Sequence, residues 1–561
     1  MKQITLAIGI ILSSSTFGQN YDLSWASQTT SDMHNDNRGM VEFGDFIYVT
    51  GRVESTGTLT MTDNASIPFT SNGSDDIFLS KINKNGSIVW TKTMGGTSNE
   101  QAVAITVDQT GNPHILGFYS DSIDMNPNAG ETNLIAAGDR DVFVAKFDTD
   151  GNLVWAKSVG GAGVDQGEGI TILSNGIAIT GRFQGTFDAD PSASTAFLTS
   201  NGNNDIFIVK LDFNGDHVWS KNIGSNGGDI GWDLATTSND RIVVTGVFKN
   251  TVAFDGANAA AIFTSNGNND VYVLCLDEAG NHLWSKAFGG ISNDIGGFVD
   301  TDASGNIYVG GLFSDSIDLD PGIGVVSKIS NGLEDAFLIK FDNDGEYIWS
   351  SAIGSVEGTD RYKGITFGPE GDIYSVGLFA GTLTAGTATL TSNGLSDCFI
   401  EKLSPAGTSI WAKSYGGAGD DFANAIIVDA DTSIYLDGKF AVSMNVSPNA
   451  TDSILIASGD FDGYIFKWYL PQAVVEDTSS ASISNLNLNE LMIYPNPSSS
   501  LVTIQSNNTI DAVSMFDIRG RLVQPTIIRI NDTTIQLEVS GIESGKYIIH
   551  INDRHFSFIK N

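Results

Sequence analysis

The sequence predicts an all-β fold built from repeated antiparallel sheets, and three features of the chain lead to this prediction. Glycine is abundant (63 residues), proline is scarce (12 residues) and aromatic residues make up 10% of the chain. No long segment shows helical periodicity. Tryptophan and an Asp-x-aromatic motif each recur at intervals of 62 to 65 residues. Recurrence at a fixed interval is typical of repeat architectures.

Two motifs define the repeated unit. The first is a tryptophan, at Trp25, Trp90, Trp155, Trp219, Trp284, Trp349 and Trp411. The second is an aspartate at the start of a β-rich segment, at Asp76, Asp141, Asp205, Asp270, Asp335, Asp397 and Asp462. Both motifs therefore count seven units.

Each unit contains four predicted strands. The first follows a glycine-rich turn, as in residues 102–107, and the second follows a polar turn, as in residues 306–311. A longer connection leads to the third strand, which carries the aspartate motif, and the fourth carries the tryptophan. Four short antiparallel strands per unit predict the blade of a β-propeller.

The chain begins in the middle of a unit. Residues 21–27 form a fourth strand around Trp25, whereas the last unit stops after its third strand at residues 464–467. The N-terminal strand can therefore complete the last unit and leave no free sheet edge. We expect residues 19–470 to form a seven-bladed β-propeller closed by the N-terminal strand, with the tryptophans packed between blades.

The repeated unit also resembles a known family. Its Asp-x-Phe strand, Asn-Gly type turn, Trp-x-Lys strand and Gly-Gly pair are similar to the bacterial β-propeller repeats known as SBBP repeats. Local departures are Cys275 in place of the strand lysine, and Ser27 and Ser351 in place of the lysine after tryptophan. The resemblance implies a propeller fold and says little about activity.

The two ends of the chain predict an export route. Residues 1–18 have the basic start, short apolar core and small-x-small end of a secretory signal peptide. Residues 471–487 are polar and serine-rich, as in a linker. Residues 488–561 regain strand patterning and predict a small immunoglobulin-like β-sandwich.

The C-terminal segment resembles the type A sorting domain of the type IX secretion system. The resemblance is carried by the YPNP motif at residues 494–497, the VSMFDIRG segment at 513–520, the GIESGKY segment at 541–547 and the final strand at 555–560. It implies engagement with the type IX machinery, passage through the periplasm, and release from or anchoring to the outer surface of a Bacteroidota-type bacterium. An ordinary immunoglobulin-like module is the alternative.

The charge of the chain restricts its binding partners, and its two cysteines predict free thiols. The formal net charge is −37 and the pI is about 4.2, so nucleic acid and anionic membranes would be repelled. No segment after residue 18 is long and apolar enough to predict a transmembrane helix. Cys275 and Cys398 fall in strands of different units, which predicts two buried free thiols.

One acidic residue follows each tryptophan by ten or eleven positions. A ring of such carboxylates could hold a cation such as Ca²⁺, because hard cations take several oxygen ligands. The favoured alternative is that each carboxylate accepts backbone N–H bonds in its turn. The members are Asp36, Glu100, Asp165, Asp229, Asp294, Asp360 and Asp421.

Two Asp-x-Asp-Pro segments are a second candidate for calcium. Asp188 and Asp190 form the first, and Asp318 and Asp320 form the second. Asx-turns before proline are the favoured alternative.

The sequence contains no catalytic motif such as a nucleophile elbow, a phosphate-binding loop or a metalloprotease helix. A binding or adhesion module for glycan or protein is therefore the first functional hypothesis. The alternatives are a polysaccharide hydrolase or lyase and a purely structural surface protein. An enzyme needs polar residues that break the repeat near the channel, and the candidates are Glu168, Trp232, Asp233, Arg361, Tyr362 and Lys363.

Overall fold

The computed structural model describes residues 21–61, 66–256, 258–449 and 453–470, together with 491–494 and, with short gaps, 501–560. The chain divides into a large part, Met1–Gln472, and a tail, Ala473–Asn561. The predicted signal peptide (1–18) and linker (471–487) lie outside the described residues. In the portion of the chain that is described, no helix has the length and apolar character needed to cross a membrane.

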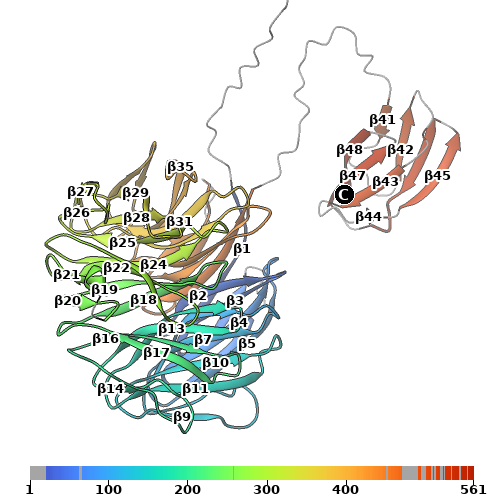
Figure 1. The fold of residues 1–561 in the computed structure, drawn as a ribbon. Coiled ribbons are helices and arrows are strands. Elements are labelled where there is room, and N and C mark those ends of the chain that lie inside the picture. Colours follow the sequence, from blue (N-terminus) through green and yellow to red (C-terminus); the bar gives the residue numbers. More distant parts are fainter. Residues whose placement is uncertain are drawn as a thin grey trace, which may run out of the picture. The chain divides into compact units, whose positions relative to one another are not determined.

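The large part is all-β, with one short 3-10 turn at Ala259–Ala261 (Figure 1). Antiparallel strands recur in seven groups of four, which correspond to the predicted units. The first strands are β2 (Asp36–Phe43), β6 (Glu100–Val107), β12 (Gln166–Leu173), β18 (Ile230–Thr236), β24 (Asp294–Thr301), β30 (Arg361–Phe367) and β36 (Asp421–Val428). The second strands are β3 (Phe46–Met61), β7 (Pro113–Tyr119), β13 (Gly176–Phe183), β19 (Ile242–Phe248), β25 (Ile307–Phe313), β31 (Ile373–Phe379) and β37 (Ile434–Phe440).

The third and fourth strands carry the two sequence motifs. The third strands are β4 (Ser66–Asn83), β10 (Asp141–Phe147), β16 (Asp205–Leu211), β22 (Asp270–Leu276), β28 (Asp335–Phe341), β34 (Asp397–Leu403) and β40 (Asp462–Tyr469). The fourth strands are β5 (Ile88–Gly96), β11 (Leu153–Gly161), β17 (His217–Ile223), β23 (His282–Phe288), β29 (Tyr347–Ile353), β35 (Ser409–Gly417) and, from the start of the chain, β1 (Asp22–Ser31).

Strand β1 completes the seventh unit. It runs antiparallel to β40, with Trp25 opposite Lys467 and Gln28 opposite Tyr464. The same strand also pairs with the far end of β3 in the first unit. Tyr21, which is fully buried, packs against Trp411 of the sixth unit at a ring-centroid distance of 5.6 Å. The N-terminal strand therefore pairs with a strand that lies more than 400 residues away along the chain.

The connection between the second and third strands is more ordered than the sequence predicted. In six units it forms a small two-stranded hairpin, and in the first unit the extended ends of β3 and β4 pair instead. The hairpins are β8 (Ser122–Asp124) with β9 (Asn133–Ile135), β14 (Thr186–Asp188) with β15 (Phe197–Thr199), β20 (Thr251–Ala253) with β21 (Ile262–Thr264), β26 (Ser316–Asp318) with β27 (Ser327–Ile329), β32 (Thr382–Ala385) with β33 (Ala388–Thr391), and β38 (Ser443–Asn445) with β39 (Ile454–Ile456).

The repeated tryptophans bind neighbouring units together, as the sequence predicted. The indole N–H of Trp155 donates to the carbonyl of Phe213 at 3.1 Å, in the β16–β17 turn of the next unit. Gly215 closes that turn with a φ of 78°, and a side chain there would meet the Trp155 ring. Trp25, Trp90, Trp219, Trp284 and Trp349 repeat this hydrogen bond.

Cys275 and Cys398 are both buried and free, which confirms the prediction.

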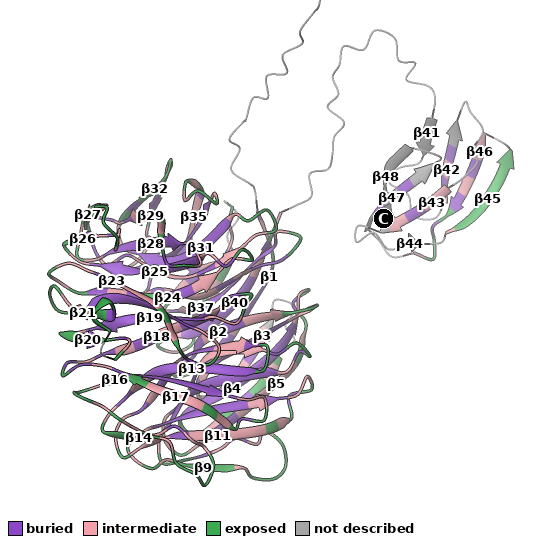
Figure 2. Ribbon diagram, in the orientation of Figure 1, coloured by how far each residue is buried: buried purple, intermediate pink, exposed green. Residues whose placement is uncertain are grey.

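The tail contains two four-stranded sheets. One has the order β41 (Leu491–Tyr494), β42 (Leu501–Ser506), β46 (Thr534–Glu538), β45 (Thr526–Asn531), and the other has the order β44 (Leu522–Val523), β43 (Val513–Asp517), β47 (Gly545–Ile551), β48 (Arg554–Lys560). Val502, Ile504, Met515 and Leu537 are among its fully buried side chains. Edge strand β45, by contrast, is exposed along its whole length (Figure 2). The short strands predicted from the sequence are present.

Candidate functional site

A cavity of about 510 Å³ lies between the first strands of all seven units. Every one of these strands contributes residues to its wall. Each unit therefore places residues in the wall of this cavity, where they can reach the same ligand.

Each first strand contains a β-bulge at the same position, where one residue is skipped in the pairing with the second strand. A bulge leaves the extra residue unpaired and changes the direction of its side chain. All seven bulge residues line the cavity, and all seven differ in type. They are Arg38, Val103, Glu168, Trp232, Gly297, Lys363 and Asn424.

The two positions after the bulge vary much less. The residue after it is glycine or alanine in five units, as at Gly39 and Ala104. The next residue is an aliphatic side chain or methionine that faces the core, as at Ile170 and Met40. The sequence analysis had singled out Glu168, Trp232 and Lys363 but missed Arg38 and Asn424. Asn424 lies three residues after Asp421 but Arg38 lies two residues after Asp36, so spacing from the acidic residue alone did not identify both.

In six units, the acidic residue of the predicted ring accepts a hydrogen bond from the backbone of the preceding turn. A backbone N–H donates to Glu100 (3.1 Å), Asp165 (2.7 Å), Asp229 (2.6 Å), Asp294 (2.6 Å), Asp360 (2.5 Å) and Asp421 (2.6 Å) from the turn four or five residues earlier. Burial raises the pKa of Asp165 to about 7 and that of Asp421 to about 8. These carboxylates thus have the partners that the favoured alternative predicted.

Asp36 was wrongly placed in this ring. Asn35 lies three residues before the bulge and takes the repeated position, where its side-chain oxygen accepts the N–H of Glu54 at 3.3 Å. The spacing of eleven residues from Trp25 is therefore one residue too long in this unit.

Asp36 instead belongs to an ionic cluster at one end of the cavity. Its carboxylate lies 2.7 Å from Nε of Arg38 and 3.3 Å from Nζ of Lys439. Burial opposes ionisation, but the charges of Arg38, Lys439 and Arg52 hold the pKa of Asp36 below its ordinary value. Asn424, another bulge residue, donates to Asp36 at 3.2 Å.

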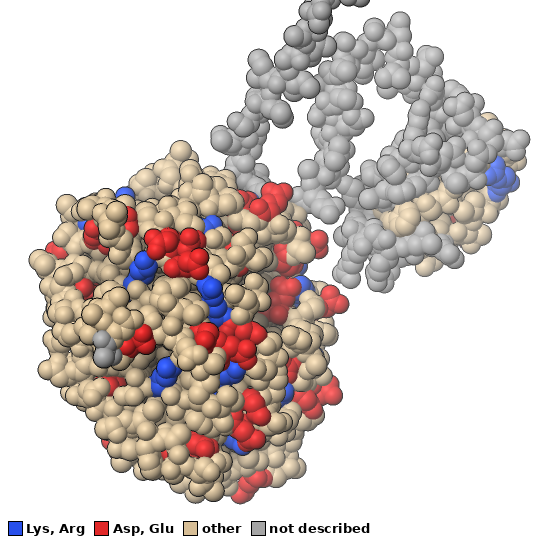
Figure 3. Space-filling view, in the orientation of Figure 1, with Lys and Arg blue, Asp and Glu red and all other residues tan. Residues whose placement is uncertain are grey.

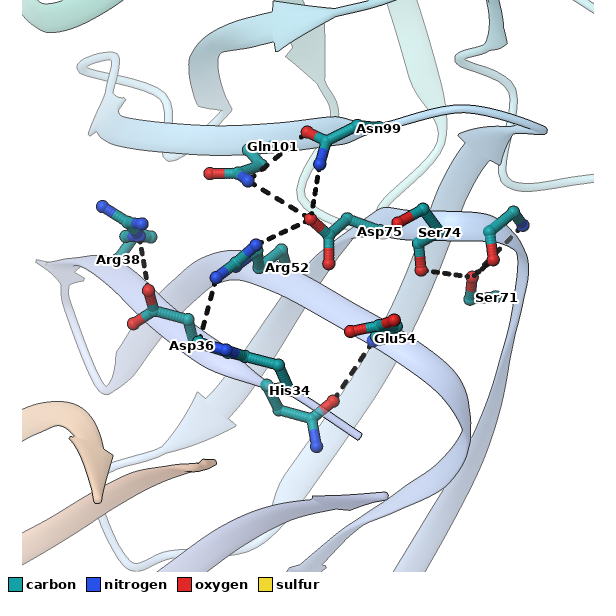
Figure 4. Close-up of polar contacts among 12 residues, drawn as sticks. His34, Asp36, Arg38, Arg52, Glu54, Ser71, Ser74, Asp75, Asn99 and Gln101 are labelled. Carbon is teal, nitrogen blue, oxygen red and sulfur yellow. Dashed lines mark hydrogen bonds and ion pairs between the residues drawn. The ribbon is translucent and has the colours of Figure 1, made fainter. Parts of the chain in front are cut away.

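The cluster continues across the first and second units (Figure 4). Arg52 donates to Asp75 at 2.7 Å and lies 3.0 Å from the His34 ring nitrogen. Asn99 and Gln101 also donate to the Asp75 carboxylate, at 2.8 Å and 3.3 Å. This network fixes the side chains at that end of the cavity.

Glu168 and Lys363 are the two bulge residues whose pKa values are shifted from their ordinary values. Burial raises the pKa of Glu168 to about 7, although Arg182, Arg38 and Lys363 oppose the shift. Its Oε1 atom is buried and has no hydrogen-bond partner among the described residues. Burial and the charges of Arg361 and Arg38 lower the pKa of Lys363 to about 8. Both groups therefore titrate close to neutral pH.

Two further carboxylates lie farther along the cavity wall. Asp233 accepts the N–H of Val299 at 3.0 Å and that of Leu234 at 2.8 Å. Asp300 accepts the N–H of Thr301 at 2.7 Å. Burial raises both pKa values to about 7.

The two remaining predicted residues do not line the cavity. Arg361 is half-buried two residues before the Lys363 bulge. Tyr362 is not in the cavity, because it is buried in the core and donates to Glu401 at 2.5 Å.

The Asp-x-Asp-Pro segments form Asx-turns. Asp188 accepts the N–H groups of Asp190 (3.1 Å) and Ala196 (2.8 Å), and Asp190 accepts that of Ser192 (2.9 Å). Asp318 and Asp320 repeat these bonds. Among the described residues, no group of three or more His, Cys, Asp or Glu side chains is arranged to hold a metal ion.

The tail matches a known domain family. Residues 492–561 match the secretion system C-terminal sorting domain. The tail is thus a type IX sorting domain, and it directs the protein to the cell surface or the exterior.

Two curated proteins are each 23% identical to this chain. One is an uncharacterized WD repeat-containing protein of Acanthamoeba polyphaga mimivirus, matched over 453 residues, and the other is the regulatory protein FlaEY of Caulobacter vibrioides, matched over 476 residues. The matches cover 65% and 80% of this chain but 32% and 47% of those proteins. The chain therefore spans a third to a half of the length of these relatives.

Among solved structures, a polysaccharide ulvan lyase aligns with a TM-score of 0.38 and 10% identity, covering 78% of this chain and 96% of that one. Sqt1 of Chaetomium thermophilum aligns with a TM-score of 0.35 and 9% identity, covering 81% and 100%. Similarity at this level does not bear on the activity of this chain.

Proposed function

We propose that this protein is a secreted or cell-surface binding module, a closed seven-bladed β-propeller of the SBBP type that takes its ligand, a glycan or a protein, in the central cavity. The pairing of β1 with β40 and the contact between β2 and β36 support the closed ring. The sorting domain supports delivery to the surface.

The observation that carries the proposal is the chemical variety of the bulge residues. Repeated positions in the same strands hold turns and cores together, so they need the same residue in each unit. The bulge positions are free of that requirement, and Arg38, Glu168, Trp232, Lys363 and Asn424 present five different chemistries to one cavity. A purely structural ring would not need this asymmetry, whereas specific recognition does.

A glycan array with the full secreted chain tests the proposal, followed by calorimetry on the strongest hit. Trp232→Ala should abolish binding of that hit. The matched control is Phe197→Ala, because Phe197 is 64% exposed on the outer β14–β15 hairpin. Equal binding by both variants would place the ligand outside the cavity and contradict the proposal.

A polysaccharide hydrolase or lyase is the second candidate. General acid–base catalysis requires groups that titrate near the working pH, and Glu168 and Lys363 do so in the same cavity. Incubation of the array hit with the full chain should then release new reducing ends or unsaturated products. Glu168→Gln should stop this release while the hit still binds. An intact polysaccharide after prolonged incubation would leave binding as the only role.

The export route also belongs to the proposal. We expect residues 1–18 to be removed as a signal peptide, residues 471–487 to act as a linker and residues 488–561 to be needed for outer-membrane passage. Protein recovered outside the cell should begin at Gln19, and deletion of 488–561 should retain it in the periplasm. Surface delivery of the deletion variant would contradict this assignment.

A further inference from the structure

Basic side chains gather around one end of the cavity in an otherwise acidic protein, and two of them, Arg38 and Lys363, line it. The chain has 29 Lys and Arg residues against 66 Asp and Glu residues, and acidic side chains cover more of the face drawn in Figure 3 than basic ones do. Residues 21–470 contain six arginines, of which only Arg241 lies elsewhere. The basic cluster comprises Arg38, Arg52, Arg140, Arg182, Arg361, Lys363 and Lys439.

Strand register explains why these residues meet. Arg361 lies on a first strand, two residues before the bulge. Arg52, Arg182 and Lys439 lie on second strands. Each pairs with the residue that lies two positions before the bulge on the first strand of its own unit. Arg140 forms a β-bridge with Val164 immediately before β12. All seven therefore lie at the end of the first strands that carries the bulges.

The basic cluster is held in place but not neutralised. Arg182 donates to Gln166 at 2.7 Å, and the Arg140 guanidinium stacks 4.3 Å from the Phe118 ring centroid. Among the described residues, the contacts of the seven cations involve four carboxylates, so positive charge is in excess. These are Asp36, Asp75, Glu168 and Glu334.

The cations also affect one another's ionisation. Burial, Arg361 and Arg38 lower the pKa of Lys363 to about 8, and burial, Arg52 and Lys439 lower that of His34 to about 4. Like charges that crowd in this way are relieved by a bound anion. The side chains remain reachable, since Arg38 is 33% exposed and Lys439 17%.

At the same end of the first strands the fourth and fifth units have apolar residues instead, while their carboxylates, Asp233 and Asp300, lie farther along the cavity wall. At the positions equivalent to Asp36 and Arg52 they have Ile230 with Val247, and Ile295 with Leu312. Trp232 and Phe298 line the cavity in these two units. The indole N–H of Trp232 is buried and has no partner in the described part of the chain. An apolar ring thus lies in the same cavity as the cations, with the Arg182 guanidinium 6.0 Å from its centroid.

We infer that the ligand of this cavity is an acidic saccharide, whose carboxylate or sulfate groups bind the basic cluster while a sugar ring lies against Trp232. This inference rests on the proposed binding function and specifies its ligand class. Arginine suits both anions, because its planar guanidinium forms paired hydrogen bonds with them.

Matched pairs of polysaccharides test the inference with the full chain. The probes are oligogalacturonate against its methyl ester, and dextran sulfate against dextran, each measured by calorimetry. The charged member of at least one pair should bind about tenfold or more tightly than the neutral one, and added salt should weaken it. The pair that responds shows whether carboxylate or sulfate is the recognised group. Equal affinity for charged and neutral members, or no binding by any of the four, would overturn the inference.

Arginine variants test the location. Arg182→Gln and, separately, Arg38→Gln should each weaken the charged probe about tenfold, whereas Arg241→Gln, just before β19 and away from the cluster, should not. Equal losses in all three would overturn the inference. A neutral glycan whose binding is lost in Trp232→Ala would uphold the cavity as a binding site while refuting the acidic ligand. A neutral glycan that Trp232→Ala still binds would refute both.

Discussion

Asp165 and Glu168 lie three residues apart near the start of the third unit and differ in their surroundings. Asp165 occupies a repeated position, and it accepts the N–H groups of Gly161 at 2.7 Å and Gln184 at 3.1 Å. Glu168 occupies the bulge, and one of its oxygens has no partner among the described residues. Burial raises both pKa values to about 7. In this pair, the hydrogen-bond partners, and not the pKa, distinguish the turn carboxylate from the carboxylate that lines the cavity.

Loss of β1 should have the largest effect on the framework. Its removal exposes the edge of β40 and takes away the buried side chain of Trp25. A chain lacking residues 21–31 should show no cooperative thermal unfolding. If its unfolding remained cooperative at a similar temperature, the N-terminal strand would not be what holds the seventh unit.

Replacement of a repeated carboxylate should come next. Asp165→Ala leaves two backbone N–H groups without their acceptor, which should cost about 2–4 kcal/mol of unfolding free energy. Glu168→Ala removes no such bond and should change stability by less than about 1 kcal/mol. Denaturant unfolding of the two variants measures the difference. Equal losses of unfolding free energy in the two variants would contradict the distinction between framework and lining residues.

The pH dependence of stability provides a related test on Asp165. Because its pKa is raised in the folded state, the folded protein binds this proton more tightly than the unfolded chain does. Its contribution to stability is therefore present at low pH and is lost as the pH rises toward about 7. Asp165→Asn cannot titrate, so its stability relative to the natural protein should increase from pH 4 to pH 7. A constant difference across this range would contradict the raised pKa.

A smaller effect is expected at the contacts between units. Trp219 donates to the Glu278 carbonyl at 3.1 Å, so Trp219→Phe should cost about 1 kcal/mol for the hydrogen bond. The indole N–H of Trp411 has no partner among the described residues, because Tyr21 at the chain start takes the place of a turn. Trp411→Phe should therefore cost less in thermal unfolding. The reverse order would show that packing outweighs this hydrogen bond.

The sequence was sufficient for the framework because each framework residue has the same task in every unit. The spacing of Trp155 and Trp219 identified the units, and the offset of Trp25 led to the β1–β40 pairing. Asp36 was misassigned because a single added residue of spacing does not show which of Asn35 and Asp36 faces the turn.

The cavity lining was only partly predictable, because a bulge has no residue preference that reveals it. Glu168, Trp232 and Lys363 were noticed as departures from the repeat. Arg38 and Asn424 could be recognised only when the strand register placed all seven bulges on one wall. The hairpins within the long connections escaped prediction because each strand has only three or four residues.

A variant without the non-repeating lining would test the central claim most directly. It carries alanine at Arg38, Glu168, Trp232, Lys363 and Asn424, and its affinity for the strongest glycan-array hit is measured by calorimetry beside that of the natural chain. We predict that it unfolds cooperatively at a similar temperature and no longer binds the glycan. Undiminished binding by this folded variant would contradict the assignment of the cavity as the functional site.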